Sequence, residues 1–246
     1  MAVLVTRPEP ENAATAEALR ARGFDALLAP LLQFQTLPFR FEGSATYGGV
    51  IVTSASALRA VRGHVLCEQL KDAPVFSVGA RTADAARSVG FANVTSADGD
   101  VAALARLVAG HVGRRTRHPP LLYLAGADTS ADITSELARS RIAVTTLTVY
   151  RMAAVDSLPQ EIVSAFAAHR IEAVLHYSGR SASSFVVAIR AAGLEVGGLA
   201  VPQVCMSASV AQLLREAGAP RAIVAERPEE GAMIEALERT LRPARA

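Results

Sequence analysis

Three segments in the first half of this chain are repeated, in the same order, in its second half. The matched pairs are 3–8 with 121–126, the turn at Ser54 with the turn at Ser178, and the turn at Gly79 with the turn at Ser207. The offset between matched residues grows slowly along the chain, as small loop insertions would cause. A chain built from two such copies is constrained to form two similar units.

Length and composition are compatible with that arrangement. A chain of 246 residues can form one large or two modest domains, and the duplication favours two. Hydrophobic residues make up 51% of the chain, enough for two cores. No apolar run reaches the roughly 20 residues that a membrane span needs, and the start of the chain lacks a signal-peptide pattern. We therefore expect a soluble, cytoplasmic protein that does not bind membranes.

Charge and cysteine content exclude several other classes. The net charge is only +2, and the basic run 114–118 has no interleaved aromatic residues, so nucleic acid is not an expected partner. Cys67 and Cys205 are too few to suggest a disulfide framework. The five histidines show no metal-ligand spacing, so we expect no metal and no cofactor.

Short apolar segments alternate with amphipathic helical patterns along the chain, which is typical of βαβ units on parallel sheets. Strands are predicted at 2–6, 25–29, 49–53, 74–78, 92–95, 120–125, 142–150, 173–177, 202–206 and 221–225. Helices are predicted at 10–22, 56–70, 80–88, 100–112, 129–140, 158–168, 180–192, 208–217 and 230–241. The predicted fold class is therefore α/β.

Two segments, 31–38 and 144–151, alternate apolar and polar residues and have no helix after them. Such alternation with β-branched residues indicates strands. Because the two segments lie at equivalent points of the two copies, they can pair as a ladder between two lobes, with the chain crossing over and back. A plain tandem arrangement, with a boundary near 114–120, is the alternative.

The turns after the predicted strands are the candidate binding sites. Ligands of open α/β sheets bind beyond the carboxyl ends of the strands, and the N–H groups of helix N-termini attract anions. Similar lobes with such turns facing one cleft would suit a ligand with many separate carboxylates or phosphates. The candidate binding residues are Arg7, Thr53, Ser54, Ser56, Gly79, Arg81, Thr82, Gly126, Ser178, Gly179, Arg180, Ser207 and Ser209. For any single turn, an ordinary helix N-cap is the alternative interpretation.

Motifs for common chemistries are missing from the sequence. It has no Gly-rich nucleotide fingerprint, no nucleophile elbow and no clustered Ser/His/Asp or Cys/His group. Tyr150, at the end of the second alternating strand, is the most interesting ionisable candidate. A phenol at the lip of a cleft can donate a proton to a leaving oxygen, although an aromatic residue on a half-exposed strand needs no such role.

At these residues the chain resembles the uroporphyrinogen-III synthases, a family of cofactor-free cyclases of tetrapyrrole biosynthesis. The resemblance rests on Val3-Leu4-Val5-Thr6-Arg7-Pro8, Tyr47-Gly48-Gly49-Val50-Ile51-Val52-Thr53-Ser54, Ser77-Val78-Gly79-Ala80-Arg81-Thr82-Ala83, Gly126 and Leu147-Thr148-Val149-Tyr150-Arg151. The chain departs from the family pattern at two turns of the second copy, at Ser178-Gly179-Arg180 and at Ser207-Ala208-Ser209.

The resemblance implies a fold of two Rossmann-like (flavodoxin-like) parallel-sheet lobes joined by a two-stranded antiparallel linker. Lobe 1 would comprise 1–32 and 154–246, lobe 2 would comprise 38–145, and the linker strands would lie at about 31–38 and 144–151. It also implies that the substrate is hydroxymethylbilane, a linear tetrapyrrole with eight carboxylates, which is dehydrated and cyclised to uroporphyrinogen III with inversion of ring D. Tyr150 would assist departure of the hydroxyl, and Thr82 would lie close to the cleft. The expected form is a monomer in transient contact with the deaminase that supplies the substrate.

Two other functions compete with this interpretation. A non-catalytic, two-lobed cytoplasmic protein that binds a polyanionic small molecule would use the same turns. A glycosyl- or phosphoryl-transferase with paired Rossmann lobes would need a nucleotide site with paired carboxylates or a lysine, and the predicted strand ends lack both. The fold class alone does not separate these functions.

Overall fold

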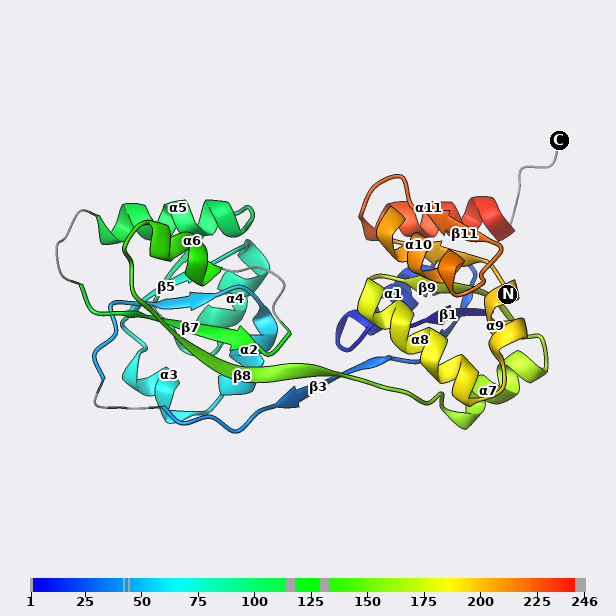
Figure 1. Cartoon of the computed structure of the whole chain (residues 1–246), viewed down its shortest axis with the longest axis horizontal. Coiled ribbons are helices and arrows are strands. Elements are labelled where there is room, and N and C mark those ends of the chain that lie inside the picture. Colours follow the sequence, from blue (N-terminus) through cyan, green and yellow to red (C-terminus); the bar gives the residue numbers. More distant parts are fainter. Residues whose placement is uncertain (1, 42, 44, 114–117, 129–132, 242–246) are drawn as a thin grey trace. The chain divides into compact units, whose positions relative to one another are not determined.

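The chain forms two compact units in the computed structural model shown in Figure 1. The structure describes residues 2–41, 43, 45–113, 118–128 and 133–241. Unit 1 comprises the chain up to Gln33 together with the chain from Ala153 onward, and unit 2 comprises Phe34–Met152. The chain therefore passes from one unit to the other twice.

Unit 1 is built on a five-stranded sheet with the order β11-β10-β9-β1-β2, whose paired strands are parallel. Its strands are β1 (Ala2–Val5), β2 (Asp25–Leu28), β9 (Ile171–His176), β10 (Gln203–Cys205) and β11 (Ala222–Val224). Its helices are α1 (Glu11–Arg20), α7 (Gln160–Ala167), α8 (Gly179–Ala191), α9 (Glu195–Ala200), α10 (Ala208–Glu216) and α11 (Glu230–Leu241).

Side chains on the strands of unit 1 alternate between two cores, as the period of two of a strand requires. Leu4 and Val174 face the core that α7, α8 and α10 cover. Val3 and Val5 face the opposite core, which α1 and α11 cover. Because both faces are covered, the strands read as continuous apolar runs.

Unit 2 contains a six-stranded sheet with the order β3-β8-β7-β4-β5-β6. The strands of this sheet are β3 (Leu32–Thr36), β4 (Val50–Val52), β5 (Pro74–Ser77), β6 (Asn93–Ser96), β7 (Leu121–Gly126) and β8 (Val144–Ala154). The start of β3 and the end of β8 belong to unit 1. The helices of unit 2 are α2 (Ala55–Val61), α3 (Val65–Gln69), α4 (Ala80–Ser88), α5 (Val101–Val112) and α6 (Ile133–Arg139). Val50 and Val52 face α2, α3 and α4, whereas Ile51 faces α5 and α6 across the sheet (Figure 1).

The one antiparallel pair within the described residues joins β3 to the second half of β8. The Leu37 N–H donates to the Val149 carbonyl at 2.9 Å, and the Val155 N–H donates to the Leu31 carbonyl at 3.0 Å. The first half of β8 instead pairs in parallel with β7. The expected α/β class with two parallel sheets and an antiparallel linker pair is thereby confirmed.

The duplication read from the sequence reappears in the sheet orders. The matched strands β1 and β7, β4 and β9, and β5 and β10 hold the same places in the two sheets. The first copy gives β1 and β2 to the sheet of unit 1 and β4, β5 and β6 to the sheet of unit 2. The second copy gives β7 and β8 to the sheet of unit 2 and β9, β10 and β11 to the sheet of unit 1. Each sheet is therefore completed by strands from both copies.

One helix prediction is wrong, and one helix was missed. The predicted helix 56–70 is divided into α2 and α3, because Gly63 between them has a φ of +74°, which a continuous right-handed helix does not accommodate. The short helix α9 was not predicted, because its two glycines weaken the helical pattern. Residues 114–117 of the basic run and 129–132 of a predicted helix lie outside the described residues. Among the helices described, none has the length and apolar character to cross a bilayer.

Candidate functional site

The carboxyl ends of the parallel strands of each sheet lie at one edge, and the candidate residues lie at these two edges. We define the unit 1 edge as the turns that follow β1, β9 and β10, and the unit 2 edge as the turns that follow β4, β5 and β7, together with Tyr150 of β8. The structure places Arg7, Ser178, Gly179, Arg180, Ser207 and Ser209 at the unit 1 edge. It places Thr53, Ser54, Ser56, Gly79, Arg81, Thr82, Gly126 and Tyr150 at the unit 2 edge.

At two matched turns a serine caps its own helix. The Ser54 hydroxyl accepts the Ser56 N–H at 3.1 Å at the start of α2. The Ser178 hydroxyl accepts the Ser181 N–H at 3.2 Å and also contacts the Ser181 hydroxyl at 2.9 Å at the start of α8. These two hydroxyls satisfy helix N–H groups, which is the ordinary N-cap role.

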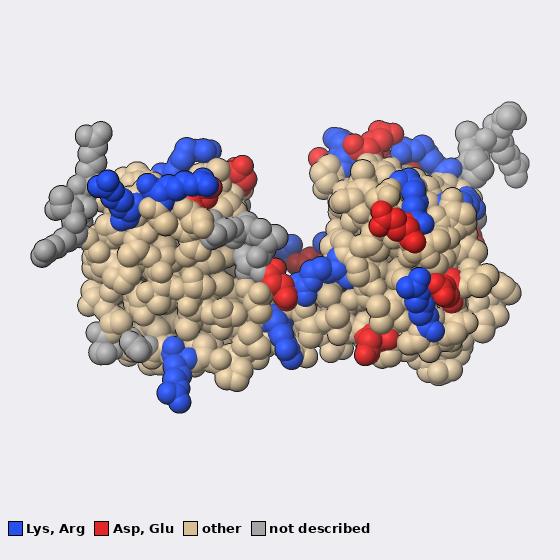
Figure 2. All heavy atoms as spheres, in the orientation of Figure 1, with Lys and Arg blue, Asp and Glu red and all other residues tan. Residues whose placement is uncertain are grey.

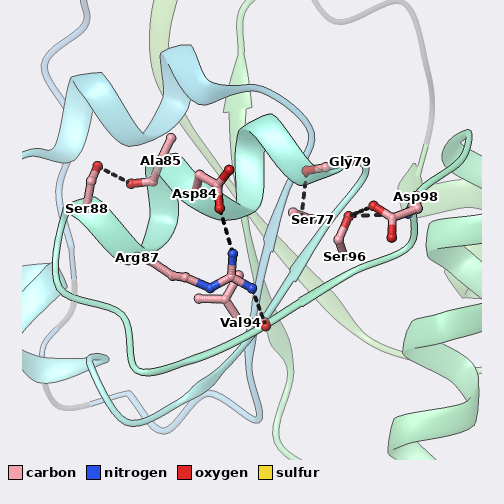
Figure 3. Close-up of polar contacts among 9 residues, drawn as sticks. All are labelled: Ser77, Gly79, Asp84, Ala85, Arg87, Ser88, Val94, Ser96 and Asp98. Carbon is pink, nitrogen blue, oxygen red and sulfur yellow. Dashed lines mark hydrogen bonds and ion pairs between the residues drawn. The ribbon is translucent and has the colours of Figure 1, made fainter.

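At the other two matched turns the helix has no side-chain cap. Gly79 is the N-cap residue of α4, and Ser207 is the N-cap residue of α10. Within the described part of the chain, neither helix receives a hydrogen bond from the side chain of its N-cap residue. The Ser77 hydroxyl donates to the Gly79 carbonyl at 3.3 Å and so braces the turn before α4 (Figure 3). The Ser207 hydroxyl instead shares a hydrogen bond with the Ser209 hydroxyl at 3.0 Å. The first turns of α4 and α10 therefore keep the anion-attracting character of an uncapped helix.

The threonines of the unit 2 edge are engaged within the protein. Thr82 is only 7% exposed on the inner face of α4. The Thr53 hydroxyl shares a hydrogen bond with the Tyr123 hydroxyl at 3.1 Å. Sequence reasoning missed Tyr123, which lies in a buried strand, and a hydroxyl in an otherwise apolar run was the one signal available. Arg81 and Arg180 are exposed, each in the first turn of its helix.

Arg7 at the unit 1 edge already holds a carboxylate of this chain. Its Nη1 donates to Glu230 Oε2 at 2.6 Å and to Thr15 Oγ1 at 3.1 Å, and its guanidinium lies 4.2 Å from the centroid of the Tyr177 ring. The Tyr177 hydroxyl donates to the other Glu230 oxygen at 2.9 Å. Burial, and then the Glu230 charge, raise the pKa of Tyr177, which keeps this donor protonated. Glu230 was not a sequence candidate, because it lies 223 residues from Arg7.

A buried polar pair lies beneath the unit 1 edge. His176, the last residue of β9, bonds through Nε2 to Gln203 Oε1 at 2.8 Å. Gln203 Nε2 donates to the Gly198 and Val201 carbonyls, so Oε1 is the acceptor and His176 Nε2 carries the hydrogen. His176 Nδ1 has no partner among the described residues. Burial lowers the pKa of His176 to about 4, against a smaller opposing effect of the Gln203 bond, so the imidazole is neutral at pH 7.

A β-bulge brings Tyr150 opposite Gly126. The register of β7 and β8 shifts between Ala125 and Gly126, so that Val149 is skipped and Gly126 pairs with Tyr150. The Tyr150 carbonyl accepts the Ala127 N–H at 2.8 Å. A Cβ built on Gly126 would lie 2.7 Å from Tyr150 Cζ and 2.9 Å from its hydroxyl oxygen. The half-buried phenol therefore lies directly over the glycine at the unit 2 edge.

On the face drawn in Figure 2, neither unit carries charges of one sign alone. Lys and Arg are interspersed with Asp and Glu on the face of each unit drawn in Figure 2. Within the described residues, no group of three His, Cys, Asp or Glu side chains could hold a metal ion. Anion binding at the two edges would depend on individual arginines and helix N-termini.

Comparisons with known proteins agree with this architecture. The model of the family described as Uroporphyrinogen-III synthase HemD matches residues 13–235. The uroporphyrinogen-III synthetase of Helicobacter pylori matches with a TM-score of 0.63 at 16% identity, over 98% of this chain and 99% of that chain. A mutant uroporphyrinogen III synthase of the extremely thermophilic bacterium Thermus thermophilus matches with a TM-score of 0.55 at 18% identity, over 98% and 99%. At these identities the two structures show a shared fold alone. Among curated proteins, no sequence match is found.

Proposed function

Because this chain belongs to the uroporphyrinogen-III synthase HemD family, we infer that it dehydrates and cyclises hydroxymethylbilane to uroporphyrinogen III. The observation that carries this inference is the family match over residues 13–235. The substrate is a linear tetrapyrrole with many separate carboxylates, and its unassisted closure gives the wrong isomer. The protein's main task is then to hold the terminal rings in the productive geometry.

We propose that the uncapped turns bind substrate carboxylates. The first turns of α4 and α10, which directly follow Gly79 and Ser207, carry N–H groups that attract anions. The exposed side chains of Arg81 and Arg180 add charged hydrogen-bond donors. Ser54 and Ser178 play the supporting role of helix caps. Arg7 shares its guanidinium with Glu230, so a substrate carboxylate at Arg7 would have to compete with that side chain.

We further propose that Tyr150 is the proton donor of the dehydration. Its phenol gives a proton to the departing hydroxyl, which leaves as water while the pyrrole nitrogen supplies the electrons, and a protonated azafulvene remains. Ring closure later releases a proton, which restores the phenol. The half-buried ring at the end of the β7–β8 pair supports this role, because it presents one donor at the unit 2 edge. The proposal includes a cytoplasmic monomer without a cofactor, in transient contact with the upstream deaminase.

Product isomer analysis tests the function. Hydroxymethylbilane is generated in situ, the protein is added, and the oxidised products are separated into uroporphyrins I and III. Predominance of isomer III is the expected result, since the spontaneous reaction gives isomer I. Isomer I alone, from folded protein, would reject the synthase activity and favour the binding-protein alternative.

A capping carboxylate at an uncapped turn is expected to compete with the substrate. Gly79→Asp and Ser207→Asp should each raise KM about tenfold and change kcat less than about twofold, because an in-chain carboxylate occupies the N–H groups. Steady-state kinetics checks both values. Gly79→Ala is the control, since the added Cβ meets no atom within 4 Å and brings no acceptor. Equal KM values for the Asp and Ala variants would remove this turn from the binding site.

A further inference from the structure

We propose that Phe34 and Gly126 are positioning residues that fix the Tyr150 phenol from the strands on either side of β8, with Arg59 holding Phe34 in place. The proposal rests on the proposed role of Tyr150 and extends it to residues that do not themselves carry the proton. In the sheet order β3-β8-β7, Phe34 belongs to β3 and Gly126 belongs to β7.

Gly126 supplies the space that the phenol occupies. The built Cβ at this position comes within 3.0 Å of three Tyr150 ring and hydroxyl atoms, Cζ, the hydroxyl oxygen and Cε1. Gly126 is not among the glycines with positive φ, so its backbone conformation is open to other residues. The glycine is therefore required for the approach of the phenol, and any side chain there would displace the reactive hydroxyl.

Phe34 holds the phenol from the other neighbouring strand. The Phe34 and Tyr150 ring centroids are 5.7 Å apart with an interplanar angle of 23°, an offset-stacked geometry. The adjacent bond from Arg151 Nε to Gln35 Oε1, at 2.8 Å, holds β3 and β8 in register beside the stack. The phenol is thus confined by contacts that a strand pair alone would not provide.

Arg59 extends the stack to a third element. Its guanidinium carbon lies 3.6 Å from the centroid of the Phe34 ring, which is cation–π distance. Arg59 lies on α2, the helix that follows β4, and its side chain reaches back over β3. The ring of Phe34 is therefore held between a neighbouring helix and the phenol that it positions.

The other copy of the duplication lacks this arrangement. At the offset of 118 residues that relates 3–8 to 121–126, Pro8 and Leu32 correspond to Gly126 and Tyr150. Leu32 is 7% exposed and belongs to the buried core, whereas Tyr150 is half-buried. At the matched positions of the first copy, the chain thus folds without the glycine, the phenol or the stack. Their presence at only one of the two matched places points to a role in the reaction.

The experiment compares Phe34→Leu, Phe34→Tyr, Tyr150→Phe and the Phe34→Leu/Tyr150→Phe double variant. Phe34→Leu should lower kcat about tenfold with KM within about twofold, because the phenol moves from its productive position. Phe34→Tyr keeps the stacked ring and should restore kcat to within about twofold of wild type. In the Tyr150→Phe background, Phe34→Leu should cause no further loss.

A structural readout accompanies the kinetics. In protein labelled at tyrosine rings, the Tyr150 resonance is identified by its absence in Tyr150→Phe. It should shift in Phe34→Leu through loss of the ring current, and in Arg59→Met through a change in the Phe34 ring. Arg59→Met should also lower kcat about twofold to threefold. If Phe34→Leu does not fold, the kcat of Arg59→Met and the position of its Tyr150 resonance decide the question.

The outcomes separate the two proposals. A wild-type rate for Tyr150→Phe would overturn the proposed proton donor, whatever Phe34→Leu does. A slow Tyr150→Phe would leave that donor standing. If Tyr150→Phe is slow but Phe34→Leu reacts at the wild-type rate, positioning by Phe34 is overturned. The same follows if Phe34→Leu lowers kcat by the same factor in the Tyr150→Phe background as in wild type. An unmoved Tyr150 resonance in both Phe34→Leu and Arg59→Met would overturn it as well.

Discussion

Tyr150→Phe is expected to lower kcat for uroporphyrinogen III formation by roughly 100-fold. The variant keeps the ring that stacks on Phe34 and covers Gly126, and it removes only the hydroxyl. Because proton donation is needed in the transition state and not for binding, KM should stay within about twofold of wild type. Steady-state kinetics with separation of the uroporphyrin isomers measures both the rate and the product.

Tyr47→Phe is the matched control for this variant. Tyr47 is also a half-buried tyrosine of unit 2, and its ring stacks on Phe41 at 6.0 Å. It lies at neither sheet edge, so its replacement should leave kcat and KM unchanged. Equal rates for the Tyr150→Phe variant, the Tyr47→Phe variant and wild type would exclude Tyr150 as the proton donor.

The stability of unit 1 is expected to fall by about 3 kcal/mol as the pH is lowered from about 6.5 to about 4, because of His176. The folded protein holds this imidazole neutral, with its pKa lowered to about 4 by burial, against the ordinary value of 6.5. Between these pH values the unfolded chain binds a proton that the folded chain does not. The contribution is therefore fully present above pH 6.5 and is lost as the pH falls toward 4.

His176→Gln should remove this pH dependence. The amide can still donate to Gln203 Oε1 but does not titrate, so the variant should gain stability relative to wild type as the pH falls. Urea unfolding at several pH values measures the difference, and hydrogen exchange of β9 and β10 amides assigns it to unit 1. His169→Asn, an exposed histidine of the same unit, is the control. A constant free-energy difference between wild type and His176→Gln from about pH 7 to about pH 4 would show that His176 is not the group responsible.

The position of this buried pair is not demanded by the fold. At the offsets of the matched turns, His176 corresponds to Val52 and Gln203 corresponds to Val75 in unit 2. Unit 2 thus builds the same strand pair from two valines. The polar pair in unit 1 is a feature of this copy, and the penalty for protonating its imidazole is felt only in acid.

Much of the local structure could be predicted from the sequence. The helices 80–88 and 230–241 were predicted with the bounds found for α4 and α11. The strand patterns placed Ser54, Gly79 and Ser207 at helix starts, where the structure has them. These predictions succeed because helix and strand periodicity and the turn preferences of Gly and Ser act within a few residues. The prediction of one continuous helix at 56–70 failed because the positive φ of Gly63 overrides the amphipathic pattern.

The partners of the candidate side chains could not be predicted in this way. Ser54 and Ser207 are both serines at the start of a helix, yet of these two only Ser54 caps its helix through its side chain. The choice depends on rotamers and neighbours, such as Ser209, that periodicity does not describe. The same holds for Thr53, whose hydroxyl partner Tyr123 comes from the adjacent strand of the sheet.

The alternation of strands and helices and the duplication were therefore set by the order of residues along the chain, since each depends on neighbours close in sequence. The tertiary structure decided how the copies divide between two sheets, because the same strand patterns also satisfy a tandem arrangement. It also decided that Glu230 holds Arg7 and that Phe34 stacks on Tyr150. Such contacts join residues far apart along the chain, and they form only where packing and strand register bring those residues together.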